Sequence, residues 1–200
     1  GVLFWDTILR ESVPDCYADL GYRTVSTNPC GEIPLCPYDS CRLLAINLYS
    51  YVVNPFKPDA YFDFDLFKKH VALAQRIMDD IIDLELEKIE RIMAKIDSDP
   101  ENEDVKHTES VLWQKIYKKS GQGRRTGVGI TAEGDMLAAL GLRYGTEEAT
   151  EFAEKVHQTV ALSAYRSSVE MAKERGAFEV YDSEREKNNP FINRLREADP

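Results

Sequence analysis

The most regular alternation of apolar and polar positions lies between residue 63 and about residue 96. Apolar residues recur there at intervals of three and four, which is the repeat of one face of an amphipathic α-helix. That face is formed by Phe67, Val71, Ala74, Met78, Ile81 and Ile82. Asp63 or Asp65 is expected to cap the N-terminus. A bend or break is expected near Asp83 and Leu84, where the apolar stripe drifts away from this face.

The same reasoning predicts two further helices. Residues 105–119 form a second amphipathic segment, followed by a Gly-rich basic loop at 120–125. Thr146 is a typical N-cap for a third helix that runs to about Arg175 and stops at Gly176. Small side chains gather in this third helix, at Ala161, Ser163, Ala164, Ser167 and Ser168. A neighbouring element is therefore expected to pack closely against it.

Extended segments are predicted at residues 22–27, 41–53, 127–131 and 177–180. The third of these should turn into a short helix at 135–140 that is closed by Gly141. Its glycines do not form a dinucleotide-binding fingerprint, because the third glycine arrives one position late and no apolar strand precedes it. Residues 14–21 are expected to be a loop, and residues 182–200 a charged segment without predicted elements.

Composition narrows the classes of function. The 200 residues carry a net charge of −10, which disfavours a nucleic-acid partner. No apolar run approaches the length of a membrane span, so no membrane partner is expected. The four cysteines form no Cys-x-x-Cys pair and are few for the length, which argues against structural zinc and against a disulfide scaffold. A cytoplasmic protein without a metal site is the resulting expectation.

Reactive side chains are concentrated between residues 26 and 41. Asn28, Cys30 and Glu32 bring an amide, a thiol and a carboxylate to alternate positions, which share one face in an extended segment. Gly31 would let a substrate approach the backbone closely. A nearby carboxylate raises the pKa of a thiol, which disfavours a thiolate nucleophile and suits a thiol that loses a hydrogen atom. The alternative is a buried structural cysteine in a Pro/Gly turn.

The segment Asn28-Pro29-Cys30-Gly31-Glu32 resembles the finger loop of ribonucleotide reductases, most closely that of the adenosylcobalamin-dependent class. The segments 41–48 and 124–131 extend this resemblance over nearly the whole chain. The resemblance implies an α/β fold, as part of a ten-stranded α/β barrel with a central finger loop. Residues 1–200 would be a mostly helical internal fragment of that barrel, with the finger loop at 26–41 and a helical part at 63–176.

The resemblance also implies roles for individual residues. Cys30 would carry a thiyl radical that abstracts the ribose 3′ hydrogen, and Glu32 would accept the 3′-hydroxyl proton. Asn28 would hydrogen-bond the substrate hydroxyls, with Ser26 and Thr27 beside it in the substrate site. The expected reaction is the reduction of ribonucleotides to 2′-deoxyribonucleotides, with adenosylcobalamin as cofactor.

The reducing electrons would come from a second thiol. Cys41 is expected to open an apolar strand and, by the resemblance, to form a disulfide with a cysteine outside this chain. Cys36, between two prolines, is interpreted as a packed loop thiol. A thioredoxin-type reductant and a homodimer are further expectations of the family.

Three alternatives remain open at this point. Within the family, the chain could belong to a reductase large subunit that uses a separate radical-generating subunit. Outside it, Cys30, Cys36 and Cys41 could serve a zinc or redox-sensing module. A helical interaction domain without chemistry is the third alternative.

Overall fold

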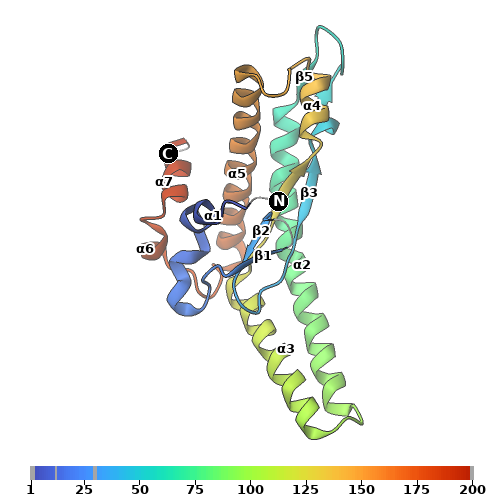
Figure 1. Cartoon of the computed structure of the whole chain (residues 1–200), viewed down its shortest axis with the longest axis vertical. Coiled ribbons are helices and arrows are strands. Elements are labelled where there is room, and N and C mark those ends of the chain that lie inside the picture. The colour runs from blue at the N-terminus through green and yellow to red at the C-terminus, as the bar shows by residue number, and fades with distance from the viewer. Residues whose placement is uncertain (1–2, 12, 29–30, 199–200) are drawn as a thin grey trace. The chain divides into compact units, whose positions relative to one another are not determined.

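The computed structural model describes residues 3–11, 13–28 and 31–198, and helices dominate it (Figure 1). The α-helices are α1 (Trp5–Glu11), α2 (Phe64–Ser98), α3 (Glu103–Gly123), α4 (Glu133–Ala139), α5 (Glu147–Arg175), α6 (Ser183–Glu186) and α7 (Pro190–Ala198). The 3₁₀ segments are η1 (Val13–Leu20) and η2 (Leu48–Tyr51). The strands are β1 (Ser26–Asn28), β2 (Ile33–Leu35), β3 (Leu44–Asn47), β4 (Val52–Val53), β5 (Tyr61–Phe62) and β6 (Val128–Thr131).

The chain divides into two compact units. Unit 1 is built from the described residues within 1–42, 79–125 and 177–200, and unit 2 from residues 43–78 and 126–176. The strands pair within the units: β1 with β2 in unit 1, and β3 with β6 and β4 with β5 in unit 2. In the described part of the chain these are two-stranded sheets and do not close into a barrel.

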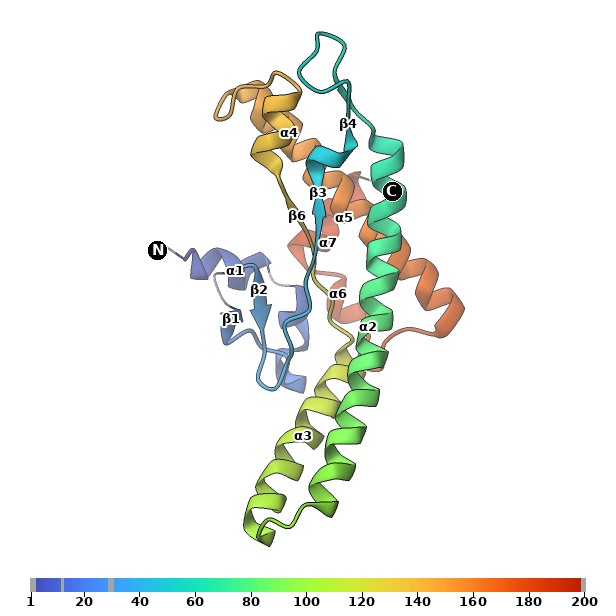
Figure 2. The ribbon, with the colours of Figure 1, turned by 90° about the vertical axis from the view of Figure 1, so that its right-hand side faces the viewer.

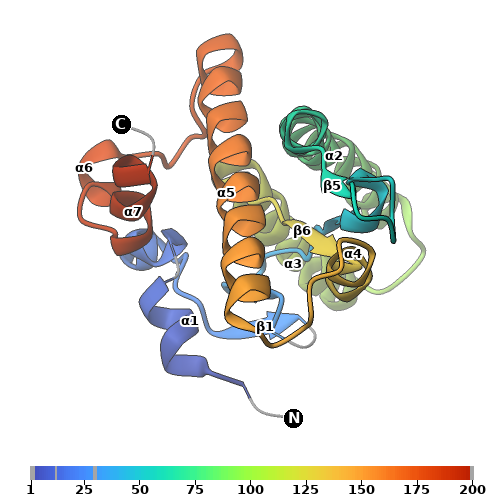
Figure 3. The same ribbon diagram turned by 90° about the horizontal axis from the view of Figure 1, so that it is seen from above.

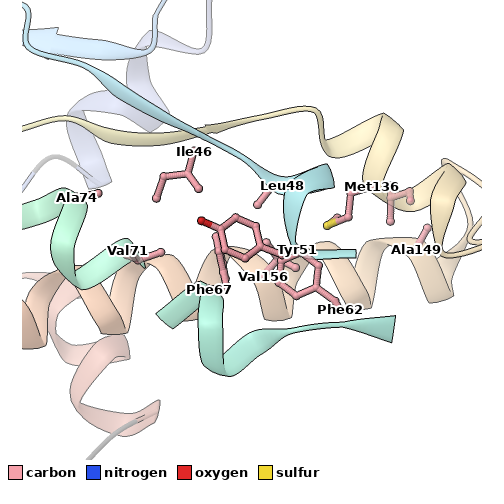
Figure 4. Packing of buried hydrophobic residues seen from close by; sticks show 11 residues of the cluster. Ile46, Leu48, Tyr51, Phe62, Phe67, Val71, Ala74, Met136, Ala149 and Val156 are labelled. Carbon is pink, nitrogen blue, oxygen red and sulfur yellow. The ribbon is translucent and has the colours of Figure 1, made fainter. Parts of the chain in front are cut away.

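Unit 2 contains the larger hydrophobic core, shown in Figure 4. Strands β3 and β6 run parallel, with Leu44 opposite Val128. Ile46 of β3 packs in a cluster with Phe67 of α2 and Val156 of α5 (Figure 4). The parallel pair is therefore covered by two amphipathic helices, as expected for an α/β arrangement.

Helix α2 confirms the longest predicted helix and one of its two candidate caps. Asp63 Oδ1 accepts a hydrogen bond from the backbone N–H of Leu66 at 2.9 Å. The predicted apolar face is buried at Phe67, Val71, Ala74, Met78 and Ile82. Ile81 was wrongly included, because this residue is 38% exposed.

The predicted break near Asp83 does not occur, since α2 is one continuous helix to Ser98. Within unit 1, its second half runs beside α3 (Figure 2). Ile89 and Ile96 are buried there, and Tyr117 of α3 donates a hydrogen bond to Glu90 of α2 at 2.7 Å. The apolar stripe drifts because the second half of the helix meets this new neighbour.

Helix α3 is longer than expected at both ends. The Asn102 side chain caps it by accepting from the N–H of Val105 at 3.0 Å. Its C-terminal turn includes residues 120–123, so the predicted basic loop does not start at Ser120. A Cβ atom on Gly123 would lie 2.6 Å from the ring of Tyr22, so glycine lets this aromatic ring pack directly on the helix.

The first and last parts of unit 1 lie side by side, as Figure 3 shows for η1, α6 and α7. Tyr17 donates to Glu186 at 2.7 Å, and Arg185 Nη2 donates to Asp19 at 2.8 Å. The loop predicted at residues 14–21 is the 3₁₀ segment η1, and the strand predicted at 177–180 does not form. Helices α6 and α7 were not predicted, because they are short and highly charged.

Other local predictions hold with narrower bounds. The strand–helix–glycine order of β6, α4 and Gly141 is confirmed, as is Thr146 as the N-cap of α5. Ser167 of α5 donates to the carbonyl of Ala72 in α2 at 2.8 Å, which confirms a close neighbour on the small face. The extended segment predicted at 22–27 forms a strand only at its end, where β1 begins at Ser26 and continues to Asn28, and the segment 41–53 is interrupted by η2. Among the described residues, no helix has both the length and the apolar character needed to cross a membrane.

Candidate functional site

The predicted finger loop begins as a β-hairpin in unit 1. Ser26 pairs with Leu35, Thr27 with Pro34, and Asn28 with Ile33 in an antiparallel ladder. The chain therefore reverses direction between Asn28 and Ile33. We expected one extended face for Asn28, Cys30 and Glu32, and the structure instead places Asn28 and Glu32 on the two sides of a reversal.

The side chains at the end of this hairpin are open to solvent. Asn28 and Glu32 are exposed, and Thr27 is half-buried. Ser26 is exposed, and its hydroxyl donates to the carbonyl of Thr27 at 3.3 Å. Cys30 lies outside the described residues. Asn28 of β1 pairs with Ile33 of β2, so it lies across the hairpin from the residue that follows Glu32.

Gly31 makes the reversal possible. Its φ is +107°, a backbone conformation that L-residues with a side chain rarely adopt. A Cβ atom there would also lie 2.8 Å from Leu3 Cδ1. The glycine next to the expected radical cysteine is thus required by the turn itself.

Cys36 is packed inside unit 1, in agreement with its interpretation as a loop thiol. It is 4% exposed and clusters with Tyr17 and Tyr22. Its thiol donates to Asp39 Oδ2 at 3.6 Å. Burial, followed by the charge of Asp39, raises the pKa of the Cys36 thiol, which keeps it protonated.

Cys41 is exposed, and it does not open a strand as predicted. Strand β3 begins three residues later, at Leu44. The reason is that Arg42 between them is buried in a polar cluster, so the segment is held by ion pairs before the ladder with β6 starts.

That polar cluster centres on Asp39, whose side chain is 2% exposed. Asp39 accepts the backbone N–H of Ser40 at 2.9 Å and the thiol of Cys36. Arg125 Nη1 lies 2.7 Å from Asp39 Oδ2, an ion pair without hydrogen-bond geometry, and Arg42 Nη1 lies 3.8 Å from Oδ1. One carboxylate therefore faces two guanidinium groups.

Each arginine is also bound to more distant segments. Arg42 donates to Ser120 Oγ at 2.7 Å and to the carbonyl of Arg125 at 3.0 Å, and it pairs with Glu85 of α2. Arg125 Nη2 donates to the carbonyl of Pro34 in β2 at 2.8 Å. Both arginines belong to segments that suggested the family, but we predicted no role for them. In the sequence, each of them is simply a charged residue near apolar ones, and this pattern does not indicate a buried ion pair.

Acidic residues of α2 form ion pairs with Arg42 and with Arg124, the residue that follows the C-terminus of α3. Arg124 donates to Asp79 at 2.8 Å and to Asp83 at 2.7 Å. Burial alone would lower the pKa of the Arg124 guanidinium, but these two bonds hold it above its ordinary value. Part of the acidic surface of α2 is therefore ion-paired. In the described part of the chain, no group of three or more His, Cys, Asp or Glu side chains is arranged to hold a metal ion.

Comparison with known proteins identifies the family of this chain. Residues 2–197 match the ribonucleotide reductase barrel domain. The chain belongs to the ribonucleotide reductase barrel-domain family. The match covers both the hairpin and the arginine-bearing segments, so it supports the reductase interpretation over a zinc module or a helical scaffold.

Several reductases are similar over most of this chain. The vitamin B12-dependent ribonucleoside-diphosphate reductase of Thermoplasma acidophilum is 35% identical over 188 residues, which are 94% of this chain and 20% of that protein. The enzyme of the same name from Mycobacterium tuberculosis is 31% identical over 186 residues, 92% of this chain and 22% of its own length. A ribonucleoside-diphosphate reductase subunit alpha from Chlamydia pneumoniae is 28% identical over 78% of this chain and 12% of its own length. The chain thus spans about a fifth of the first two reductases.

Proposed function

We propose that this chain carries the radical-bearing finger loop of a ribonucleotide reductase that converts ribonucleoside diphosphates to 2′-deoxyribonucleotides. The observation that supports the proposal is the match of residues 2–197 to the reductase barrel domain, which includes the β1–β2 hairpin where Asn28 pairs with Ile33, the residue after Glu32. The diphosphate substrate follows the names of the similar reductases. The ten-stranded barrel with a central finger loop is proposed for the complete protein, of which residues 1–200 would be an internal fragment.

The proposed chemistry starts at the end of the hairpin. A thiyl radical on Cys30 takes the hydrogen atom from ribose C3′, which restores the thiol and leaves a carbon radical. Glu32 accepts the proton of the 3′-hydroxyl as general base, and the 2′-hydroxyl leaves as water after taking a proton from the reducing dithiol described below. Asn28, with Ser26 and Thr27 beside it, would hold the substrate hydroxyls in register, which is the positioning that a radical reaction needs.

The hairpin suits adenosylcobalamin in one observable respect. Asn28 and Glu32 are both exposed, so a large cofactor can approach the turn that they flank. Adenosylcobalamin, when bound, supplies the radical that removes the hydrogen atom from a thiol. On this chain, the residues of the turn would position that thiol. A separate radical-generating subunit is the other candidate, and the B12-dependent names of similar reductases disfavour it.

Two electrons and two protons complete the reduction. They come from a dithiol that becomes a disulfide, and we propose Cys41 as one of its thiols. Its exposure allows a partner cysteine from outside this chain to reach it. A thioredoxin-type protein would regenerate the dithiol, and the complete reductase is proposed to be a cytoplasmic homodimer.

The decisive experiment replaces Cys30 with serine in the complete reductase chain. Cys30→Ser should abolish turnover, because a hydroxyl O–H bond is too strong to exchange its hydrogen atom with the cofactor radical. Deoxynucleotide formation would be measured by chromatography with and without added adenosylcobalamin. Substantial product from Cys30→Ser would refute the proposal. Activity of the wild type that needs a second subunit instead of cobalamin would refute the cofactor assignment.

Glu32→Gln provides a second measurement in the same protein. This variant keeps the shape of the side chain and loses its ability to accept a proton. Nucleotide binding should persist while kcat falls by a factor of about 100 or more, the usual contribution of general base catalysis. An unchanged kcat would contradict the role of Glu32.

A further inference from the structure

The buried charges beside Cys41 need an explanation beyond stability. Asp39 and Arg42 have side chains that are 2% and 3% exposed, and Arg125 is 17% exposed. Taking ionised groups out of water is unfavourable, and apolar residues of similar size often serve stability equally well. A buried ion cluster at this place therefore points to a requirement for fixed geometry.

The cluster fixes the backbone on both sides of Cys41. The N–H of the preceding residue, Ser40, donates to Asp39 at 2.9 Å. The following residue, Arg42, is held by Ser120, by the carbonyl of Arg125 and by Glu85. Cys41 is exposed between these two anchored neighbours.

The same cluster connects Cys41 to the finger hairpin. Arg125 pairs with Asp39 and also donates to the carbonyl of Pro34 in β2. Pro34 faces Thr27 of β1 in the ladder. One guanidinium thus bridges the hairpin that carries the Cys30 position and the carboxylate next to Cys41.

We propose that Asp39, Arg42 and Arg125 form a positioning cluster that holds the Cys41 thiol at a fixed place relative to the finger hairpin. This inference rests on the proposed function, in which both thiols act on one substrate. A held thiol reacts faster because its orientation is set before the reaction begins. None of the three side chains needs to touch the substrate.

Arg124 offers a matched control. It is adjacent to Arg125 and is also ion-paired, but its partners are Asp79 and Asp83 of α2. Replacing either arginine by glutamine removes one charge from the same part of unit 1. Only Arg125→Gln removes the link between β2 and Asp39.

The test compares Asp39→Asn, Arg125→Gln, Arg125→Lys and Arg124→Gln in the complete reductase. Asp39→Asn and Arg125→Gln should lower kcat about tenfold with an unchanged KM for the nucleotide, because the reductive step loses its oriented thiol. Native alkylation, resolved by mass spectrometry, should show Cys36 reacting about tenfold faster, since local opening governs access to a buried group. Arg125→Lys should recover part of the kcat and part of the protection of Cys36 from alkylation. Arg124→Gln should change neither kcat nor the alkylation rate of Cys36.

Two outcomes would overturn the inference. One is an equal loss of kcat in Arg124→Gln and Arg125→Gln, which would indicate a general effect on stability. The other is an Asp39→Asn enzyme whose kcat falls only in proportion to its unfolded fraction, measured by circular dichroism. A Cys41→Ser enzyme that still cycles with a dithiol reductant would refute the proposed role of Cys41, whereas Cys36 alkylation would still report on the cluster. Arg125→Lys keeps the charge, so it tests the inference if Asp39→Asn does not fold.

Discussion

At the scale of single residues, the structure separates thiols that the sequence presents as similar. Cys36 is buried and hydrogen-bonded to Asp39, whereas Cys41 is exposed. The two lie five positions apart, and only their surroundings differ. A thiol that must exchange electrons with a partner has to be reachable, so exposure favours Cys41 over Cys36 as the reducing thiol.

This difference predicts which cysteine becomes oxidised. In the complete reductase, a single turnover without added reductant should leave Cys41 blocked to alkylation, while Cys36 stays a thiol. Peptide mapping after alkylation under denaturing conditions would detect both. Finding Cys36 in the disulfide would contradict the assignment, as would full cycling of Cys41→Ser with a dithiol reductant.

Cys16 gives a prediction about pH. Burial, followed by the nearby charge of Glu186, raises the pKa of the Cys16 thiol from an ordinary value near 9 to about 11. The thiolate is the reactive form of a cysteine. In the native chain the alkylation rate of Cys16 should therefore still rise between about pH 9 and about pH 10, whereas in the unfolded chain the same rate has begun to level off there. The same shift means that alkali favours unfolding, because the unfolded chain loses this proton first. Identical pH profiles for the native and denatured chains would contradict the prediction.

At the scale of elements, the finger hairpin depends on its turn. Two short strands provide little stabilisation by themselves. Formation of the hairpin therefore depends strongly on the backbone conformation at Gly31. Its positive φ and the nearby Leu3 side chain both act against any larger residue. The glycine is thus a structural requirement of the hairpin as well as part of the family motif.

Gly31→Ala should therefore disturb the hairpin while sparing the helices. We expect a destabilisation of about 1–3 kcal/mol from the backbone strain, confined to residues near the turn. Hydrogen exchange should show faster exchange in β1 and β2, with α2 and α5 unchanged. Gly141→Ala, at another glycine with positive φ outside the hairpin, is a control that should leave β1 and β2 protected. Unchanged protection of β1 and β2 in Gly31→Ala would contradict the argument.

At the scale of the whole molecule, the chain presents apolar surface without a partner among the described residues. Large apolar side chains are exposed along α2, at Leu66, Leu73, Ile77, Ile81 and Leu84. Strands β3 and β6 pair only with each other in the described part of the chain, so each has a free edge. Exposed apolar stripes and unpaired edges promote association. Both features suit a segment that spans about a fifth of its longer relatives.

Residues 1–200 alone should therefore be marginally stable and prone to associate. Residues 63–176, which contain α2 to α5, should be the most protected part in hydrogen exchange. Light scattering coupled to chromatography and thermal unfolding would test this. A sharp cooperative transition from a strictly monomeric sample would contradict it.

The sequence by itself determined the three long helices, the N-caps of two of them and the family. Asp63, Thr146 and Gly141 act within one turn of their own positions, so their effects can be predicted from neighbouring residues. The apolar repeat of α2 is equally local, and the motif around Cys30 is contiguous. These features depend on interactions between residues close in the chain, which periodicity and capping rules describe.

Only the tertiary structure decided the continuity of α2, the exposure of Ile81 and the cluster around Asp39. Arg42 meets Glu85 and Ser120, which lie 43 and 78 positions away in the chain, and Arg125 meets Pro34 at a separation of 91. A buried ion is stable only where its partners converge, and no local pattern specifies partners at such distances. The sequence could therefore predict where Cys41 stands in the chain, whereas tertiary contacts decide how it is held.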